Sequence, residues 1–76
     1  MNDLEEIINL VSILNKAALH LDDCEEHFEQ FYQAAMACYG VYYQTLAFMN
    51  MYPNMGYNHI NKRAKGLCNK FEHNYK

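Results

Sequence analysis

Residues 31–52 read FYQAAMACYGVYYQTLAFMNMY and contain no charged side chain. The uncharged region extends further, because no Asp, Glu, Lys or Arg lies between Glu29 and Lys62. Apolar and aromatic side chains recur there at helical spacing around the whole circumference, and a helix of this kind has to be buried on all sides. The sequence therefore predicts a long central helix that the rest of a 76-residue chain is too small to cover.

Two faces of this central helix predict different partners. One face is an aromatic stripe, which is typical of a surface packed in the core of the same chain. The stripe comprises Phe28, Phe31, Tyr32, Ala35, Tyr39, Tyr42, Tyr43, Leu46 and Met49. The opposite face carries a row of mostly small side chains that also includes the larger Phe48. We call it the small-residue row, and it comprises Ala34, Ala37, Gly40, Val41 and Phe48. We expect this row to form the interface of a homo-oligomer, and close packing within one chain is the alternative interpretation.

Start and stop signals divide the chain into three predicted helices, at about residues 3–21, 23–51 and 57–75. The first helix begins with a capping box, in which the side chains of Asn2 and Glu5 each bind a backbone N–H of the first turn. The sequence thus predicts one all-α domain over residues 1–76. We expect an antiparallel three-helix bundle with a long central helix, assembled into a homo-oligomer.

Two short segments separate the predicted helices. In the acidic run at residues 22–26, DDCEE, each Asp is followed three residues later by a Glu, which is again a capping-box pattern. The segment at residues 52–56, YPNMG, ends the second helix, because proline disfavours helix in the residue before it and Asn and Gly suit a turn. The second helix would then be about 29 residues, or ~43 Å, long.

Charge is strongly partitioned along the chain. Residues 1–56 carry a net charge of −7 and residues 57–76 carry +4, which gives −3 for the whole chain at pH 7. The third predicted helix is therefore basic and amphipathic. Its basic residues either pack beside the acidic segment, in the same chain or in a neighbour, or bind an external anion.

The predicted ligand- or partner-binding residues are Lys62, Arg63, Lys65, Lys70, Tyr57 and Tyr75. Lys and Arg side chains bind phosphate and a tyrosine ring stacks on a base, so a nucleotide or another small phosphorylated ligand fits these residue types. We do not expect nucleic acid, because the sequence pI is about 5.7, arginine occurs once and no nucleic-acid-binding motif is recognisable.

Metal and enzyme chemistry find little support in the residue spacing. His20, Cys24 and His27 would share one face only in a continuous helix, whereas the capping signals predict a break there. Cys68 and His73 are five residues apart, which does not place a thiol and a base on the same helical face. We therefore expect no metal site, no catalytic site and no cofactor.

Residues 31–52 are long enough to span a bilayer, but their five tyrosines and two glutamines would bring polar groups into hydrocarbon. We therefore do not expect a membrane partner. The three cysteines are odd in number and no leader segment is recognisable, which predicts a reducing, cytoplasmic location without disulfides.

The composition includes nine asparagines and seven tyrosines but one arginine and no tryptophan. It suits an AT-rich coding sequence, and phages and mobile elements encode many short proteins of this type. A charge-polarised surface without catalytic motifs favours a small non-enzymatic helical binding protein. We expect an inhibitor or host-takeover factor that occupies a partner protein, in the host cytoplasm if phage-encoded. The alternative is an oligomeric protein that binds a nucleotide or phosphate through the basic helix.

Overall fold

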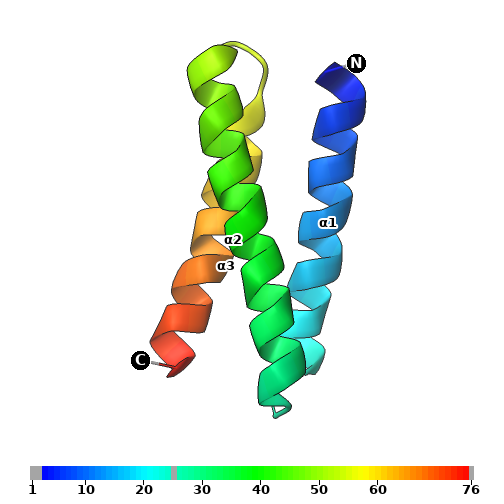
Figure 1. The fold of residues 1–76 in the computed structure, drawn as a ribbon, viewed down its shortest axis with the longest axis vertical. Helices are drawn as coiled ribbons and strands as arrows, with labels where there is room; N and C mark the ends of the chain where they lie inside the picture. The colour runs from blue at the N-terminus through cyan, green and yellow to red at the C-terminus, as the bar shows by residue number, and fades with distance from the viewer. Residues whose placement is uncertain (1–2, 25, 76) are drawn as a thin grey trace.

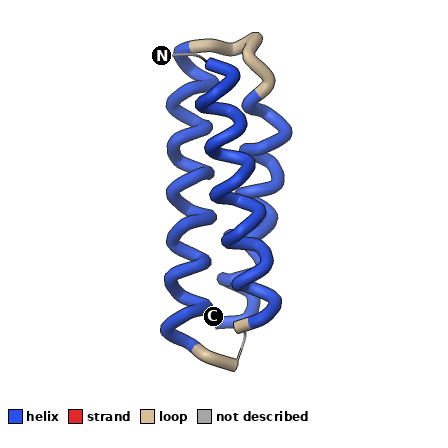
Figure 2. The backbone as a smooth tube through the Cα atoms, turned by 90° about the vertical axis from the view of Figure 1, so that its right-hand side faces the viewer, coloured by secondary structure: helices blue, strands red, loops and turns tan. Residues whose placement is uncertain are grey.

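Three helices make up the protein in the computed structural model, which describes residues 3–24 and 26–75. They are α1 (Asp3–Asp23), α2 (Phe28–Met51) and α3 (Tyr57–Tyr75), and the described residues contain no strand. Figure 1 shows α1 descending from the N-terminus, α2 rising beside it and α3 descending to the C-terminus. The helices lie side by side along their length in a body of 38 × 21 × 14 Å (Figure 2). The all-α prediction is thus confirmed.

The first turn between helices lies later than predicted. α1 continues to Asp23, and the Cys24 N–H donates to the His20 carbonyl at 2.9 Å. α2 begins at Phe28, after an extended N-cap residue, His27, whose side chain makes no capping hydrogen bond. The capping boxes predicted in the acidic run therefore do not form, because both aspartates lie inside α1. With 24 residues, α2 is ~36 Å long rather than ~43 Å.

The second turn lies where the sequence predicts it. The Tyr52 N–H closes the last turn of α2 by donating to the Phe48 carbonyl at 2.7 Å. Pro53 follows, and Gly56 has a φ of 81°, a left-handed conformation that favours glycine. α3 begins at the next residue. The capping box predicted for the first helix includes Asn2, which lies outside the described residues.

The core lies along α2, which packs against both α1 and α3, whereas α1 and α3 contact each other less. Each helix contributes one seam of apolar side chains. The buried apolar residues are Leu10, Leu14, Ala17 and Leu21 of α1, Phe31, Ala34, Ala35, Cys38 and Val41 of α2, and Tyr57, Ile60, Ala64 and Cys68 of α3. Because α2 has two neighbours rather than three, one side of this apolar helix faces outward.

A buried polar pair fixes how α3 sits on α2. The Asn61 side-chain amide donates to the Thr45 hydroxyl oxygen at 2.7 Å and to the Tyr42 carbonyl at 2.9 Å. The Thr45 hydroxyl in turn donates to the Val41 carbonyl at 2.9 Å. Both polar side chains are buried, so sliding α3 along α2 would leave the Asn61 amide without its partners at a cost of ~1–3 kcal/mol, whereas Thr45 would keep its hydrogen bond within α2.

Candidate protein-binding surface

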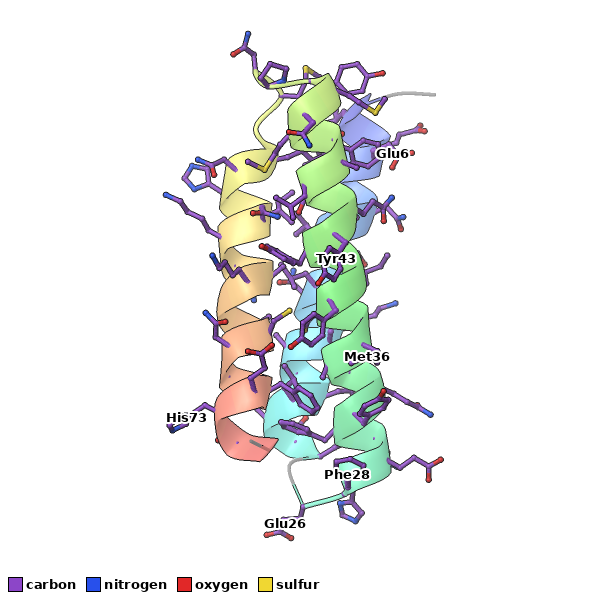
Figure 3. All side chains as sticks on the ribbon, turned by 60° about the vertical axis from the view of Figure 1, so that its left-hand side comes forward. Glu6, Glu26, Phe28, Met36, Tyr43 and His73 are labelled. Carbon is purple, nitrogen blue, oxygen red and sulfur yellow. The ribbon has the colours of Figure 1, made fainter. Side chains whose placement is uncertain are left out.

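The aromatic stripe of α2 is divided between the core and the surface, which corrects the expectation that all of it packs inside. Phe31 is fully buried, but Phe28 is 56% exposed, Tyr32 45% and Tyr43 63%. The reason is the position of α3, which covers one edge of the stripe and leaves the other edge open. Phe28, Met36 and Tyr43 appear at successive heights along α2 in Figure 3.

The open edge of the stripe forms a groove of about 510 Å³ between α2 and α3. We call it the aromatic groove, and its lining residues are Phe28, Tyr32, Met36, Tyr39, Tyr43, Phe71 and Glu72. The α2 residues of this set are three or four apart, so they line one side of a helix. Phe71 and Glu72 close the groove from α3.

Ring contacts hold the walls of the groove together. The Phe71 ring lies edge-on to those of Tyr32 and Tyr39, with centroids 6.1 and 6.5 Å away. On its inner side the same ring stacks on buried Phe31 at 5.4 Å. Along α2, Tyr39 stacks on Tyr43 at 6.4 Å. Such offset and edge-to-face pairs are favourable geometries, so the groove is shaped by the fold rather than by loose side chains.

Glu72 places one carboxylate in this aromatic surrounding. The Tyr39 hydroxyl donates to its Oε1 at 2.5 Å. This hydrogen bond, together with burial of the hydroxyl, raises the pKa of Tyr39 above its ordinary value. No Lys, Arg or His of the described residues forms a salt bridge with Glu72, although α3 is otherwise basic.

The outward side of α2 is also uncharged, as the sequence requires. We define the uncharged α2 surface as its exposed positions from Gln30 onward, namely Gln30, Tyr32, Gln33, Met36, Gly40, Tyr43, Gln44, Ala47, Asn50 and Met51. Gln33, Gly40 and Ala47 follow one another at steps of seven positions, so the surface continues along one side of the helix. It borders the aromatic groove and shares Tyr32, Met36 and Tyr43 with it.

The small-residue row predicted as an oligomer interface lies mostly inside the chain. Ala34 and Val41 are buried, and the Phe48 ring stacks on Tyr57 at 5.1 Å. Ala37 is half-buried and Gly40 is exposed. Of the row, Gly40 and part of Ala37 can therefore reach a second copy without rearrangement. A role in assembly stays a prediction for these two positions.

A second groove, of about 490 Å³, separates α1 from α2. Its small apolar lining residues are Ala17, Ala34 and Ala37, with Ile13 beside them, and its polar ones are Lys16, His20, Gln30 and Gln33. The alanines explain the hollow, because their side chains are too short to fill the space between the two helices.

The basic residues predicted to bind a ligand are only partly free to do so. Lys70 forms a salt bridge with Asp22 of α1, and an Arg63 Nη1–H donates to the Asn15 side-chain oxygen at 2.5 Å. Both contacts support packing of the basic helix against α1. Lys62 and Lys65 are exposed and form no salt bridge with a described residue.

The two tyrosines of the predicted ligand site have different outcomes. Tyr57 is 2% exposed and one face of its ring is covered by Phe48, so it offers no surface for a base. This burial removes Tyr57 from the candidate site. The Tyr75 side chain lies outside the described part of the structure, so its role in ligand binding stays a prediction.

Cysteine and histidine side chains do not converge in the described region. No group of three potential metal ligands occurs among these residues, and the Cys24 sulfur lies 3.8 Å from Nδ1 of His20. Cys38 and Cys68 are buried free thiols. Burial raises the pKa of each to about 11, which keeps them protonated and unreactive at neutral pH.

Comparisons with known proteins provide no related site against which to compare this surface. No family model matches the sequence, and neither the curated proteins nor the solved structures gave a match. A search of the described helices for a membrane-spanning segment found none that is both long and apolar enough. The candidate site therefore rests on its own geometry.

The sequence interpretation did not single out Met36, Phe71 or Glu72 as binding residues. A signal for the last of these was present, because Glu72 is the one acidic residue among the five basic residues of positions 57–76. The split of the aromatic stripe had no such signal. It depends on where α3 lies around α2, which the spacing within α2 does not specify.

Proposed function

We propose that the protein is a small non-enzymatic helical binding protein that acts by occupying the surface of a partner protein, as an inhibitor or host-takeover factor does. Its working form in this proposal is a homo-oligomer of antiparallel three-helix subunits in the cytoplasm. The observation that carries the proposal is the uncharged α2 surface, which combines exposure to solvent with a complete lack of charged side chains.

A solvent-facing helix normally carries charged residues opposite its apolar side. The centres of protein–protein interfaces differ from the rest of the surface in that they are depleted of charge and enriched in Tyr, Phe and Met. The uncharged α2 surface has this composition, with Tyr32 and Tyr43 exposed beside Met36 and Met51, the last of them 62% exposed. Contact with protein explains such a surface, whereas permanent contact with water does not.

Gly40 supports self-association through the middle of this surface. A Cβ added at Gly40 would meet no atom of the chain within 4 Å, so the helix backbone is open to solvent there. A second helix can approach the backbone closely at such a position. The glycine also lowers the helix propensity of α2 by ~1 kcal/mol relative to alanine, and a close helix contact would offset that cost.

Substitution of the two helical glycines tests the assembly part of the proposal. Gly40→Leu is expected to convert the oligomer to monomer in size-exclusion chromatography with light scattering, because the leucine blocks close approach. Gly66→Leu on α3 is the matched control, since a Cβ there also meets no atom within 4 Å. Equal assembly of both variants and the wild type would remove Gly40 from the interface.

Exposed Lys62 and Lys65 favour one alternative function, the binding of a small phosphorylated ligand. They are three residues apart and so lie on neighbouring turns of α3. Tight binding of a nucleotide that is lost in Lys62→Ala with Lys65→Ala, and that weakens with salt, would support this alternative. The burial of Tyr57 removes one of its two predicted stacking residues, which is why we place this alternative second.

A further inference from the structure

We infer that the aromatic groove is a binding site for a basic side chain, lysine or arginine, that an amphipathic helix of the partner protein inserts, with Glu72 as the counter-ion. The inference rests on the proposed function, because it names the chemistry of the partner. Four arguments support it: the carboxylate of the groove, its aromatic rings, its length and the unfavourable contacts that would arise if two copies paired groove to groove.

The carboxylate of Glu72 gives the lining of the groove a negative charge. Glu72 is half-buried, and the hydrogen bond from the Tyr39 hydroxyl is a contact with a neutral group. Lys70, on the same helix, forms a salt bridge with Asp22 of α1. A carboxylate partly removed from water and surrounded by apolar groups is stabilised most by a charged hydrogen-bond donor.

The rings favour the same kind of ligand. Five aromatic rings line the groove, from Phe28, Tyr32, Tyr39, Tyr43 and Phe71. The face of an aromatic ring carries partial negative charge and attracts ammonium and guanidinium groups within about 6 Å. Rings and carboxylate together select an organic cation over an anion or a neutral polar group. The methylene groups of a lysine or arginine side chain would lie on Met36 and the rings.

The groove has the length of a helical segment rather than of a compact ligand. Its lining follows α2 from Phe28 to Tyr43, a distance of ~22 Å along the helix. It is also an open channel on the surface between two helices. Helical partners bind grooves of this kind through apolar residues three or four positions apart, and one basic residue among them would meet Glu72.

Symmetry argues against a second copy in the same groove. Two copies could pair groove to groove about a two-fold axis, which would bring the two Glu72 carboxylates together if the axis passed near them. About any other axis, each Glu72 would face the lining of the second groove, which contains no Lys or Arg. Either arrangement buries a carboxylate without a cation beside it, which is unfavourable. A different protein that carries a basic residue has no such conflict.

Peptide binding tests this inference directly. The probe is a synthetic amphipathic helix of about 16 residues with leucines on one face and a single arginine at its centre, and the matched probe carries neutral citrulline instead. Isothermal titration calorimetry is expected to show the arginine peptide binding about tenfold more tightly to the wild type. In Glu72→Gln, which keeps an oxygen to accept from Tyr39, this preference should disappear.

Glu29→Gln serves as the matched control, because it removes the same charge from an exposed position on α2, and it should retain the preference for arginine. Equal affinity for the two peptides, an unchanged preference in Glu72→Gln, or no binding of either peptide would overturn the inference. Loss of self-association in Glu72→Gln without peptide binding would also overturn it, and would assign the groove to a second copy.

The oligomeric state of the same samples separates the two levels of the proposal. If the wild type assembles through Gly40 but binds the arginine and citrulline peptides equally, only the inference of a basic side chain on the partner is contradicted. Wild type that neither assembles nor binds either peptide contradicts the binding function as well.

Discussion

The inner and outer sides of α2 have similar composition but opposite environments. On the inner side, Phe31 and Ala35 are fully buried against the neighbouring helices, whereas on the outer side Tyr32 and Met36 are exposed. Adjacent residues of one apolar helix thus lie in two different places, some in the core and some on the solvent-exposed surface. The difference teaches that apolar spacing along α2 does not by itself decide which side chains are buried, and that part of the apolar surface of α2 is exposed in a single chain.

The largest expected effect comes from the inner side. Phe31→Ala should destabilise the fold by ~3–5 kcal/mol, because it removes a fully buried ring that stacks on Phe71 at 5.4 Å. Tyr43→Ala on the outer side should change the stability of the monomer by less than about 0.5 kcal/mol. Urea unfolding at low protein concentration measures both, and similar losses would erase the distinction between the two sides.

The buried polar pair should give the next largest effect. Asn61→Ala removes two hydrogen bonds to α2 and leaves a small cavity, for a cost of ~2 kcal/mol. Asn58→Ala on the exposed side of α3 is the matched control and should stay within about 0.5 kcal/mol of wild type. Thermal unfolding followed by circular dichroism compares them, and a neutral Asn61→Ala would show that the pair does not fix the packing of α3.

Alanine at the two helical glycines should act in the opposite direction. Gly40→Ala and Gly66→Ala are each expected to stabilise the monomer by ~0.5–1 kcal/mol, because both sites have room for a Cβ and alanine favours helix. Sedimentation velocity should then show weaker assembly for Gly40→Ala alone. Equal assembly of the two variants would place Gly40 outside the contact.

The smallest effect is expected at the α1–α3 salt bridge. Lys70 and Asp22 are 41% and 64% exposed at their side chains, so solvent screens their attraction. Lys70→Ala should cost no more than about 0.5 kcal/mol at low salt, and less at high salt. Urea unfolding at two salt concentrations measures this, with Lys62→Ala as the unpaired control. A loss above about 2 kcal/mol would mean that charge pairing orients α3.

The three helices and the second turn could be predicted from local signals, because Pro53 and Gly56 favour a turn through the backbone conformation at their own positions. The first turn could not be predicted in this way. A capping pattern shows that an acidic residue is able to cap a helix start, but it does not specify at which residue the helix begins. Asp22 instead lies near the end of α1, where a carboxylate opposes the helix dipole and Lys70 offsets it. That partner is distant in sequence, and local spacing cannot reveal it.

The lack of charge in the candidate site could be predicted from the sequence, but the position of its open face could not. The lack of charge in α2 indicated an interface, yet Ala34 and Val41 proved to be buried within the chain. The aromatic residues expected in the core supplied the groove instead. Helical spacing tells which residues share a face, whereas the angle at which α1 and α3 pack around α2 decides which face remains open.

The most direct test of the central claim, that the uncharged α2 surface is a protein interface, is native mass spectrometry of the protein after gentle lysis. We predict a homo-oligomer whose mass is a multiple of 9.0 kDa, alone or with a bound partner protein. A monomer of 9.0 kDa without a bound protein would contradict the claim, because the exposed half of α2 would then face water.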